Sequence, residues 1–134
     1  MGVLFEVIKD GEKIISLTNH SVKNVKFDSD TDITLIPKLH GVVRNLIVTG
    51  LINSDLVGNP EINSVRQLAN WAIIPEYCDC YCDVTIELSD AKGDLVKSEE
   101  FKDMFVVEYK ETFDIEHGNG LFDIHMRERE IIED

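Results

Sequence analysis

The sequence predicts a mainly β domain, an antiparallel β-barrel or sandwich with one short α-helix. Three observations lead to this prediction. A long hairpin pattern occupies residues 105–131, several shorter runs are rich in β-branched residues, and one segment spaces its apolar residues as a helix does. A chain of 134 residues is long enough to bury a core, so we expect a single domain over residues 1–134.

Residues 105–131 are predicted to form a long antiparallel hairpin. Large residues recur at every second position on both arms, with one break on the first arm, as in half-buried strands. The HGNG sequence at residues 117–120 contains an Asn-Gly pair, which suits a tight turn. Such long arms present many unpaired backbone groups, so we expect them to pair with a neighbouring subunit. The large residues expected on these inter-subunit strands are Val107, Tyr109, Phe113, Phe122, Ile124 and Met126.

The first half of the chain contains three further strand patterns. Residues 3–8 and 13–17 flank an Asp-Gly turn at residues 10–11 and are predicted to form an opening hairpin. Residues 22–27 form a weaker strand pattern, and residues 42–52 are rich in β-branched residues. The predicted order is therefore strands, then one helix, then the strands of the C-terminal half.

A single helix is predicted after residue 64. Ser64 can cap its N-terminus, and Pro75 ends it because the residue before a proline disfavours the helical conformation. Trp71 and Ile73 are expected to widen its apolar face. The residues that recur at helical spacing are Val65, Leu68, Ala69 and Ala72.

Three cysteines lie in the strand pattern of residues 77–88. Cys78, Cys80 and Cys82 share the parity of the apolar residues that follow, so we expect them to face the core. A structural zinc site usually has four ligands, and the sequence has no second cluster of cysteines or histidines. We therefore expect no metal and no cofactor.

Residues 28–41 are acidic at first, then apolar, and are predicted to be a long excursion between strands. The opening imitates a calcium loop, but Ile33 replaces the glycine at position six and Leu39 replaces the glutamate at position twelve. A long surface segment with such apolar residues covers its own core or docks on a neighbour. Its acidic and apolar residues are Asp28, Asp30, Asp32, Ile33, Leu35, Ile36 and Leu39.

The composition excludes several classes of function. The chain has 26 acidic and 13 basic residues, a formal charge of −13, so it repels phosphate and we expect no nucleic-acid binding. No apolar run approaches the roughly 20 residues that span a bilayer, so we expect no membrane insertion. No secretory leader pattern is present at the N-terminus, so we expect synthesis in the cytoplasm.

The sequence contains no catalytic motif that predicts an enzyme. Its four histidines are scattered, and it has no H-E-x-x-H zinc helix, no G-x-S-x-G elbow and no Gly-rich phosphate loop. A cysteine and a histidine could still meet in the fold as a catalytic pair. Cysteines in the middle of a buried strand, however, make poorly exposed nucleophiles.

The C-terminal pattern resembles a known family. The sequences FVVEY at 105–109, ETF at 111–113, and GNG at 118–120 with FDI at 122–124 are similar to the closing hairpin of tube-forming proteins. These are the haemolysin-coregulated protein (Hcp) of type VI secretion and the tail-tube proteins of contractile phages and injection particles. The chain is also similar to small clostridial proteins labelled "membrane-associated protease", which share a VKFDSDT-like segment and an LAxW helix. Nothing in the residues supports either word of that label.

The resemblance implies a structural protein with the Hcp-like tail-tube architecture. Such proteins form rings, usually hexamers, whose sheets join into an inner barrel, and the rings stack into a hollow tube. It implies self-association as the main partnership, with sheath, baseplate or cargo proteins as further partners, in a particle that can be released from the cell. It also implies that residues 28–41 reach the next ring. A cysteine- or metal-dependent hydrolase and a monomeric β-domain that binds a protein partner remain as alternatives.

Overall fold

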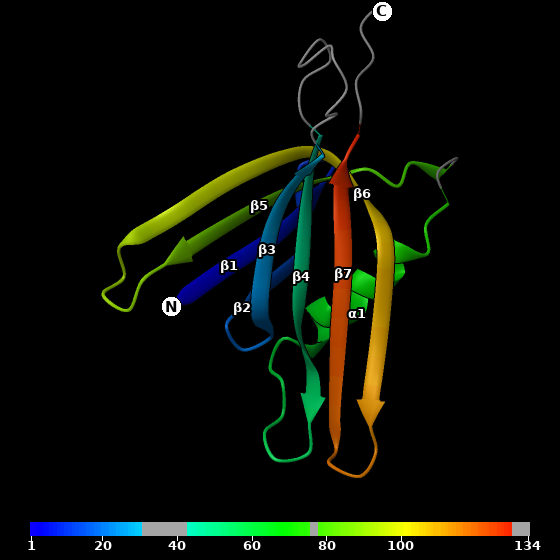
Figure 1. Ribbon diagram of the computed structural model, residues 1–134. Coiled ribbons are helices and arrows are strands. Elements are labelled where there is room, and N and C mark those ends of the chain that lie inside the picture. Colours follow the sequence, from blue (N-terminus) through cyan, green and yellow to red (C-terminus); the bar gives the residue numbers. More distant parts are fainter. Residues whose placement is uncertain (31–42, 76–77, 130–134) are drawn as a thin grey trace, which may run out of the picture.

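The computed structural model describes residues 1–30, 43–75 and 78–129, and Figure 1 shows their arrangement. These residues form a mainly antiparallel β structure with one short helix, which confirms the predicted fold class. The elements are β1 (Gly2–Lys9), β2 (Glu12–Thr18), β3 (Val22–Asp30), β4 (Val43–Ser54), α1 (Ile62–Ala72), β5 (Cys82–Ser89), β6 (Leu95–Asp114) and β7 (Asn119–Glu128). No described helix is both long enough and apolar enough to cross a membrane.

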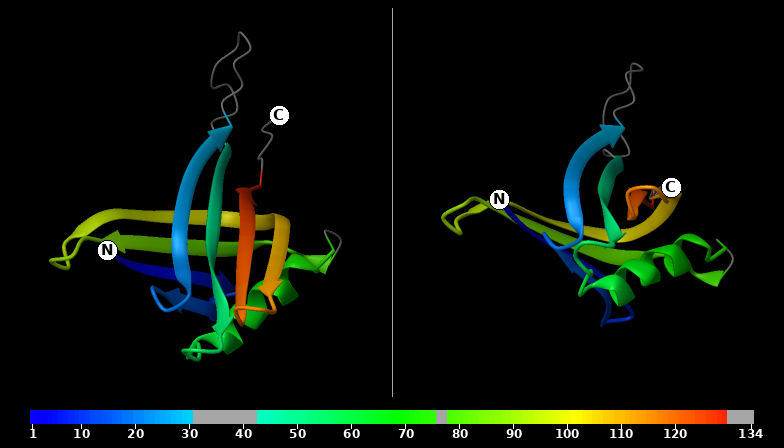
Figure 2. Two further views of the ribbon diagram at one scale, coloured as in Figure 1. Left: turned by 60° about the horizontal axis from the view of Figure 1, so that its bottom comes forward. Right: turned by 90° about the horizontal axis from the view of Figure 1, so that it is seen from below.

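The strands form one sheet in the order β2-β1-β5-β6-β7-β4-β3, and every neighbouring pair is antiparallel. Strand β6 belongs to two layers, because residues 95–104 pair with β5 and residues 104–114 pair with β7. We call these two parts the first and second halves of β6. The first layer is β2, β1, β5 and the first half of β6; the second layer is the second half of β6, β7, β4 and β3. Figure 2 shows the two layers crossing, with β6 running from one into the other.

The change of direction in β6 occurs at a β-bulge around Asp103. Asp103 has a φ of 50°, and the register between β5 and β6 shifts at this point. Its amide donates a hydrogen bond to Asp83 Oδ1 at 3.1 Å, and its carbonyl accepts one from the Arg129 amide at 2.9 Å. An extra residue in one strand bends that strand and increases its twist. The bulge therefore explains how one strand can pair with β5 in one layer and with β7 in the other.

The hydrophobic core lies between the two layers and beneath α1. Its largest fully buried side chains include Phe5, Phe101 and Phe122 from three different strands. The helix contributes Val65 and Leu68, as helical spacing predicts, and Trp71, which widens the apolar face as predicted; Ala69 and Ala72 are only partly buried. The two-residue periodicity of β7 is confirmed as well, since alternate side chains of this strand are buried. Those side chains are Phe122, Ile124 and Met126.

The structure corrects the predicted helix at both ends. The helix begins at Ile62 rather than after Ser64, with Glu61 as its N-cap residue. The Ser64 hydroxyl instead accepts a hydrogen bond from the Ser16 amide. Ile73 is 79% exposed because the helix ends at Ala72, so Ile73 does not extend the buried face as predicted.

The structure also corrects the strand predicted over residues 77–88, because β5 begins only at Cys82. Asp79 has a φ of 56°, which interrupts the alternation that the sequence pattern implies. The Cys80 carbonyl accepts a hydrogen bond from Trp71 Nε1 at 2.8 Å, so this segment packs on the helix. Cys80 and Cys82 are buried as predicted, whereas Cys78 is exposed.

The excursion predicted from residue 28 begins later than expected. Strand β3 continues through Asp30, paired with β4, so Asp28 and Asp30 belong to a strand rather than to a loop. The remaining predicted contact residues lie outside the described residues. These are Asp32, Ile33, Leu35, Ile36 and Leu39.

Candidate assembly interface

The second layer ends in two edge strands that run in opposite directions. Its strands alternate in direction from the second half of β6 through β7 and β4 to β3. With four alternating strands, the first and the last are antiparallel to each other. The β6 edge of one copy could therefore pair with the β3 edge of a second copy and continue the antiparallel pattern.

The edge formed by β2 is closed by the start of the helix. The Thr18 amide donates hydrogen bonds to the Glu61 carboxylate at 3.0 and 3.1 Å, and the Thr18 hydroxyl donates another at 2.7 Å. The Ser16 amide donates to Ser64 Oγ at 3.3 Å. Because helix side chains occupy these edge amides, a second chain cannot pair with them.

The Glu61 carboxylate that closes this edge is held in a polar network. Ser21 Oγ donates to Glu61 Oε1 at 2.7 Å, and the Asn59 side chain donates to Ser21 Oγ at 3.0 Å. Partial burial raises the pKa of Glu61, but the hydrogen bonds from Ser21 and Thr18 outweigh it, and the pKa lies below its ordinary value. The charged form of Glu61 is thus the form that the fold stabilises.

The outer edge of the first half of β6 is occupied by Arg44. Its Nη1 lies 2.9 Å from Glu99 Oε2, its Nη2 donates to the Glu100 carbonyl at 3.0 Å, and its Nε donates to Glu128. The guanidinium also lies over the Phe101 ring at 4.4 Å. Arg44 comes from β4 in the second layer, so this cluster joins the two layers near the bend.

The edges of β3 and of the second half of β6 are open. In the described part of the chain, the Ser29 amide bonds to the adjacent Asp28 carboxylate, and no other side chain occupies the outer backbone groups of these two edges. Apolar side chains at both edges are only partly buried against the core. They are Val25 and Phe27 on β3, and Val106 and Tyr109 on β6.

Tyr109 shows how incomplete this edge is. Burial raises its pKa, and so does the hydrogen bond that its hydroxyl donates to Glu111 Oε1 at 2.8 Å, so the pKa is well above the ordinary tyrosine value. The Tyr109 ring is thus neutral and only partly buried at this edge. The β6 edge is therefore suited to contact with another apolar surface.

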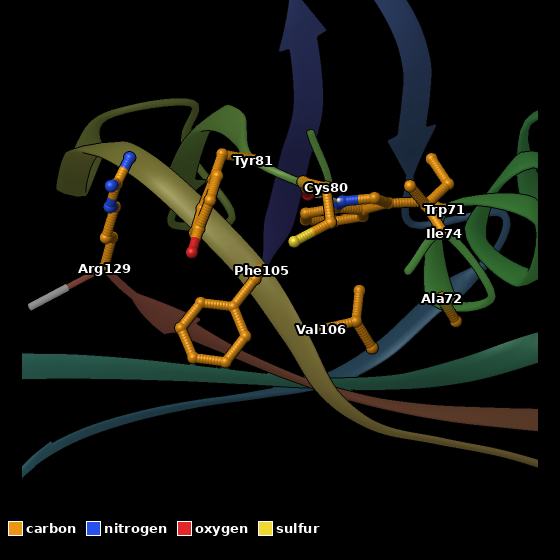
Figure 3. A pocket seen from close by; sticks show the side chains of 8 residues that line it. All are labelled: Trp71, Ala72, Ile74, Cys80, Tyr81, Phe105, Val106 and Arg129. Atoms are coloured by element: carbon orange, nitrogen blue, oxygen red, sulfur yellow. Dashed lines mark hydrogen bonds between the residues drawn. The ribbon is translucent and has the colours of Figure 1, made fainter. Parts of the chain in front are cut away.

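A groove runs beside the open β6 edge. A cavity of about 450 Å³ lies between α1 and this strand and includes the exposed side chains Ile73 and Val107. It adjoins a cavity of about 570 Å³ at the bend of β6, because Ala72 and Val106 line both. Figure 3 shows the second cavity, which is lined by the Cys80 thiol, the Tyr81 and Phe105 rings and the Arg129 side chain, from three parts of the chain.

Three of the predicted inter-subunit residues lie on the open edge strand. Val107 is 48% exposed at a register shift of β6, Phe113 is 55% exposed near the hairpin turn, and Tyr109 is partly buried between them. The prediction is corrected for the second arm of the hairpin, since β7 is paired on both sides and is not an edge strand. Its three predicted side chains, Phe122, Ile124 and Met126, belong to the core of their own subunit.

The cysteines do not form a recognisable reactive or metal site. Burial raises the pKa of Cys82 to about 11, so it is a neutral thiol at physiological pH. Cys80 is buried beside Trp71, and Cys78 is exposed. Within residues 1–30, 43–75 and 78–129, no three His, Cys, Asp or Glu side chains are grouped in a way that could hold a metal ion.

Sequence reasoning missed the closed edge, the groove and Arg129. Thr18 and Glu61 are 43 positions apart, so no local pattern announces their contact. Arg129 follows directly after the last strand, and no signal in the sequence distinguishes it from Arg127 two positions earlier.

No protein-family model and no curated protein matches the sequence. Solved structures, however, match the fold. Hcp1 from the E. coli EAEC 042 pathovar aligns with a TM-score of 0.63 and 11% identity, over 96% of this chain and 87% of that chain. This structural match identifies the fold. The chain has the Hcp-like tail-tube fold.

Two further structures with this fold come from different sources. Hcp1 from Flavobacterium johnsoniae aligns with a TM-score of 0.54 and 15% identity, over 94% of this chain and 90% of that chain. The tail of an empty GTA particle, with C6 symmetry, aligns with a TM-score of 0.53 and 8% identity, over 98% and 93% of the two chains. The Hcp-like fold is thus shared with both Hcp proteins and a particle tail, and the architecture implied by the C-terminal hairpin is confirmed.

Proposed function

We propose that this protein is a structural subunit whose rings stack into the hollow inner tube of a phage-tail-like or contractile injection particle. The observation that carries the proposal is the pair of open, oppositely directed edges in the second layer. Each copy offers one edge of each kind, so copies can join head to tail, and a ring forms when the rotation between them closes. The Hcp-like fold supports the same conclusion.

The two faces of the second layer determine which side of such a ring is hollow. One face carries the core, the helix and the first layer, and this bulk fits only on the outside of a closed barrel. The opposite face then lines the channel. It carries both signs of charge. Lys110 on β6 pairs with Asp123 on β7, and Arg127 on β7 pairs with Asn45 on β4, which in turn pairs with Asp28 on β3. The channel is thus polar, without a wall of one sign at these positions.

Six copies in a ring are supported by the C6 symmetry of the GTA tail whose fold this chain shares. Further partners would be the sheath, baseplate or cargo proteins of the particle. The subunit would be made in the cytoplasm, assembled in the particle and released with it. We assign it no catalytic role, and the buried, neutral Cys82 does not favour the hydrolase alternative.

The part of the predicted contact segment that follows β3, residues 31–41, is proposed as the contact between stacked rings. Asp30 and Val43 pair at one end of the second layer, and the β6–β7 turn lies at its other end. The connecting sequence includes Ile33, Leu35, Ile36 and Leu39, which are apolar enough to bind a neighbouring ring.

Electron microscopy of the concentrated protein tests the proposal. The expected images show rings with a central hole, and short tubes at higher concentration. Fields of particles no larger than one 15.2 kDa chain would instead favour the monomeric β-domain.

A further inference from the structure

The cavity at the bend of β6 contains the guanidinium of Arg129, which has no acidic partner in the described residues. Arg129 lies over the Tyr81 ring at 4.7 Å, and Tyr81 contacts Phe105 edge to face at 6.0 Å between ring centroids. Phe105 begins the open part of β6. The guanidinium is therefore held by an aromatic ring next to the edge where a second copy would pair.

The other open edge carries an exposed acidic residue two positions before its end. Asp28 on β3 accepts a hydrogen bond from the adjacent Ser29 amide at 2.9 Å. It forms no ion pair within the described ranges. The two edges thus carry complementary unpaired charges, Arg129 near one and Asp28 on the other.

Strand register places these two charges two residues apart along the strand direction. Phe105 pairs with Arg127, Arg127 with Asn45, and Asn45 with Asp28, so these four residues form one row across the second layer. Arg129 is two residues beyond Arg127, about 7 Å along the strand. A stagger of about two residues between neighbouring copies brings Asp28 level with Arg129, whose guanidinium lies over Tyr81 beside Phe105 at the β6 edge.

We propose that Arg129 of one copy binds Asp28 of the next copy, with the acidic end of the neighbour's β3 seated at the cavity beside the bend of β6. This inference rests on the proposed ring and names the side-chain contact that fixes its strand register. Continuity with the open edge and the opposite charges both favour a second copy of this chain over an unrelated acidic protein. The backbone pairing alone would tolerate slippage, whereas a charged pair at one row specifies the register.

Charge reversal at each edge tests the pairing. Arg129→Asp and Asp28→Lys are each expected to raise the concentration for half-assembly at least about tenfold, measured by light scattering, because two like charges then face each other. The double variant Arg129→Asp/Asp28→Lys should assemble again. An equal mixture of the two single variants should also recover, because copies that alternate around a ring restore a native pair at every second junction.

The controls reverse charges away from the open edges. Lys92→Asp lies in the β5–β6 turn, and Glu87→Lys lies on β5 in the first layer, so both should assemble like the unmodified chain. Arg129 and Asp28 are exposed, and thermal unfolding of each monomer should be unchanged. If Arg129→Asp fails to fold, Asp28→Lys and its mixture with Arg129→Ala test the same contact from the other edge.

The outcomes of these experiments distinguish the Arg129–Asp28 contact from the formation of the ring. Rings from the unmodified chain together with unaffected single variants would overturn the pairing and leave the proposed function standing. Loss of assembly in both single variants without recovery in the double variant or the mixture would also overturn it. An unmodified chain that stays monomeric at every concentration would overturn the proposed function, and the pairing with it.

Discussion

The β2 edge and the edges of the second layer each have backbone groups that no neighbouring strand of the subunit binds, but these groups have different surroundings. At β2, Glu61 and Ser64 of the helix region bind the amides of Thr18 and Ser16. At β3 and the second half of β6, partly buried apolar side chains lie beside edges with which no further strand of the described residues pairs. Unprotected edges invite pairing with other chains. The protein closes one edge and leaves two complementary ones open, which is the arrangement that directed self-association requires.

The difference between these edges was only partly predictable from sequence. The strand alternation of β7 and the helical spacing of Val65 and Leu68 depend on neighbouring residues, and both predictions are confirmed. Strand β6 changes direction at Asp103, a non-glycine residue with a positive φ angle, and no local sequence pattern predicts this angle. The sequence therefore predicts that both arms of the long hairpin pair with a neighbouring subunit, whereas the second arm, β7, lies inside the sheet between β6 and β4.

The candidate site was the least predictable part of the molecule. Val107, Tyr109 and Phe113 are predicted as contact residues because bulky residues at strand spacing need a partner surface, and their contact with a second copy stays a prediction. The closed edge depends on contacts between Thr18 and Glu61, which meet only in the fold. Sequence patterns indicate which side chains face the core. Whether a strand edge is open depends on the strands and side chains that the fold places beside it.

The largest expected effect concerns the stacking of rings. Replacing Ile33, Leu35 and Ile36 with Ser should abolish tubes and leave rings intact, because the apolar contact between rings is lost while both open edges are unchanged. Electron microscopy distinguishes the two assemblies. Tubes of normal length in this variant would contradict the stacking role, and a variant that does not fold would show that these residues cover their own subunit.

Opening the closed edge should destabilise the subunit itself. Glu61→Ala removes the acceptor of the Thr18 amide, the Thr18 hydroxyl and the Ser21 hydroxyl, and is expected to lower the free energy of unfolding by about 2–3 kcal/mol. Denaturant unfolding of a monomeric background measures this change. Asn63→Ala, at an exposed position of the same helix, is the control. A loss no greater than in the control would mean that the β2 edge is not closed by Glu61.

A smaller effect is expected from pH. The pKa of Glu61 is lowered by folding from its ordinary value of 4.5, so its contribution is complete above that value and is lost as the pH falls through the lower, folded pKa. Glu61→Gln does not titrate. The stability difference between the unmodified chain and this variant should therefore be constant near neutral pH and shrink below about pH 4.5. A difference that grows on acidification would contradict the assignment.

The central claim is that the open edges, and not the closed one, join the copies. Light scattering of three proteins tests it most directly: the unmodified chain, Val107→Asp on the open β6 edge, and Ile14→Asp on β2, where the side chain is 36% exposed. The account predicts a mass about six times 15.2 kDa for the unmodified chain and for Ile14→Asp, and a single-chain mass for Val107→Asp. A monomeric unmodified chain at high concentration and low salt, or a ring that Ile14→Asp breaks and Val107→Asp does not, would contradict it.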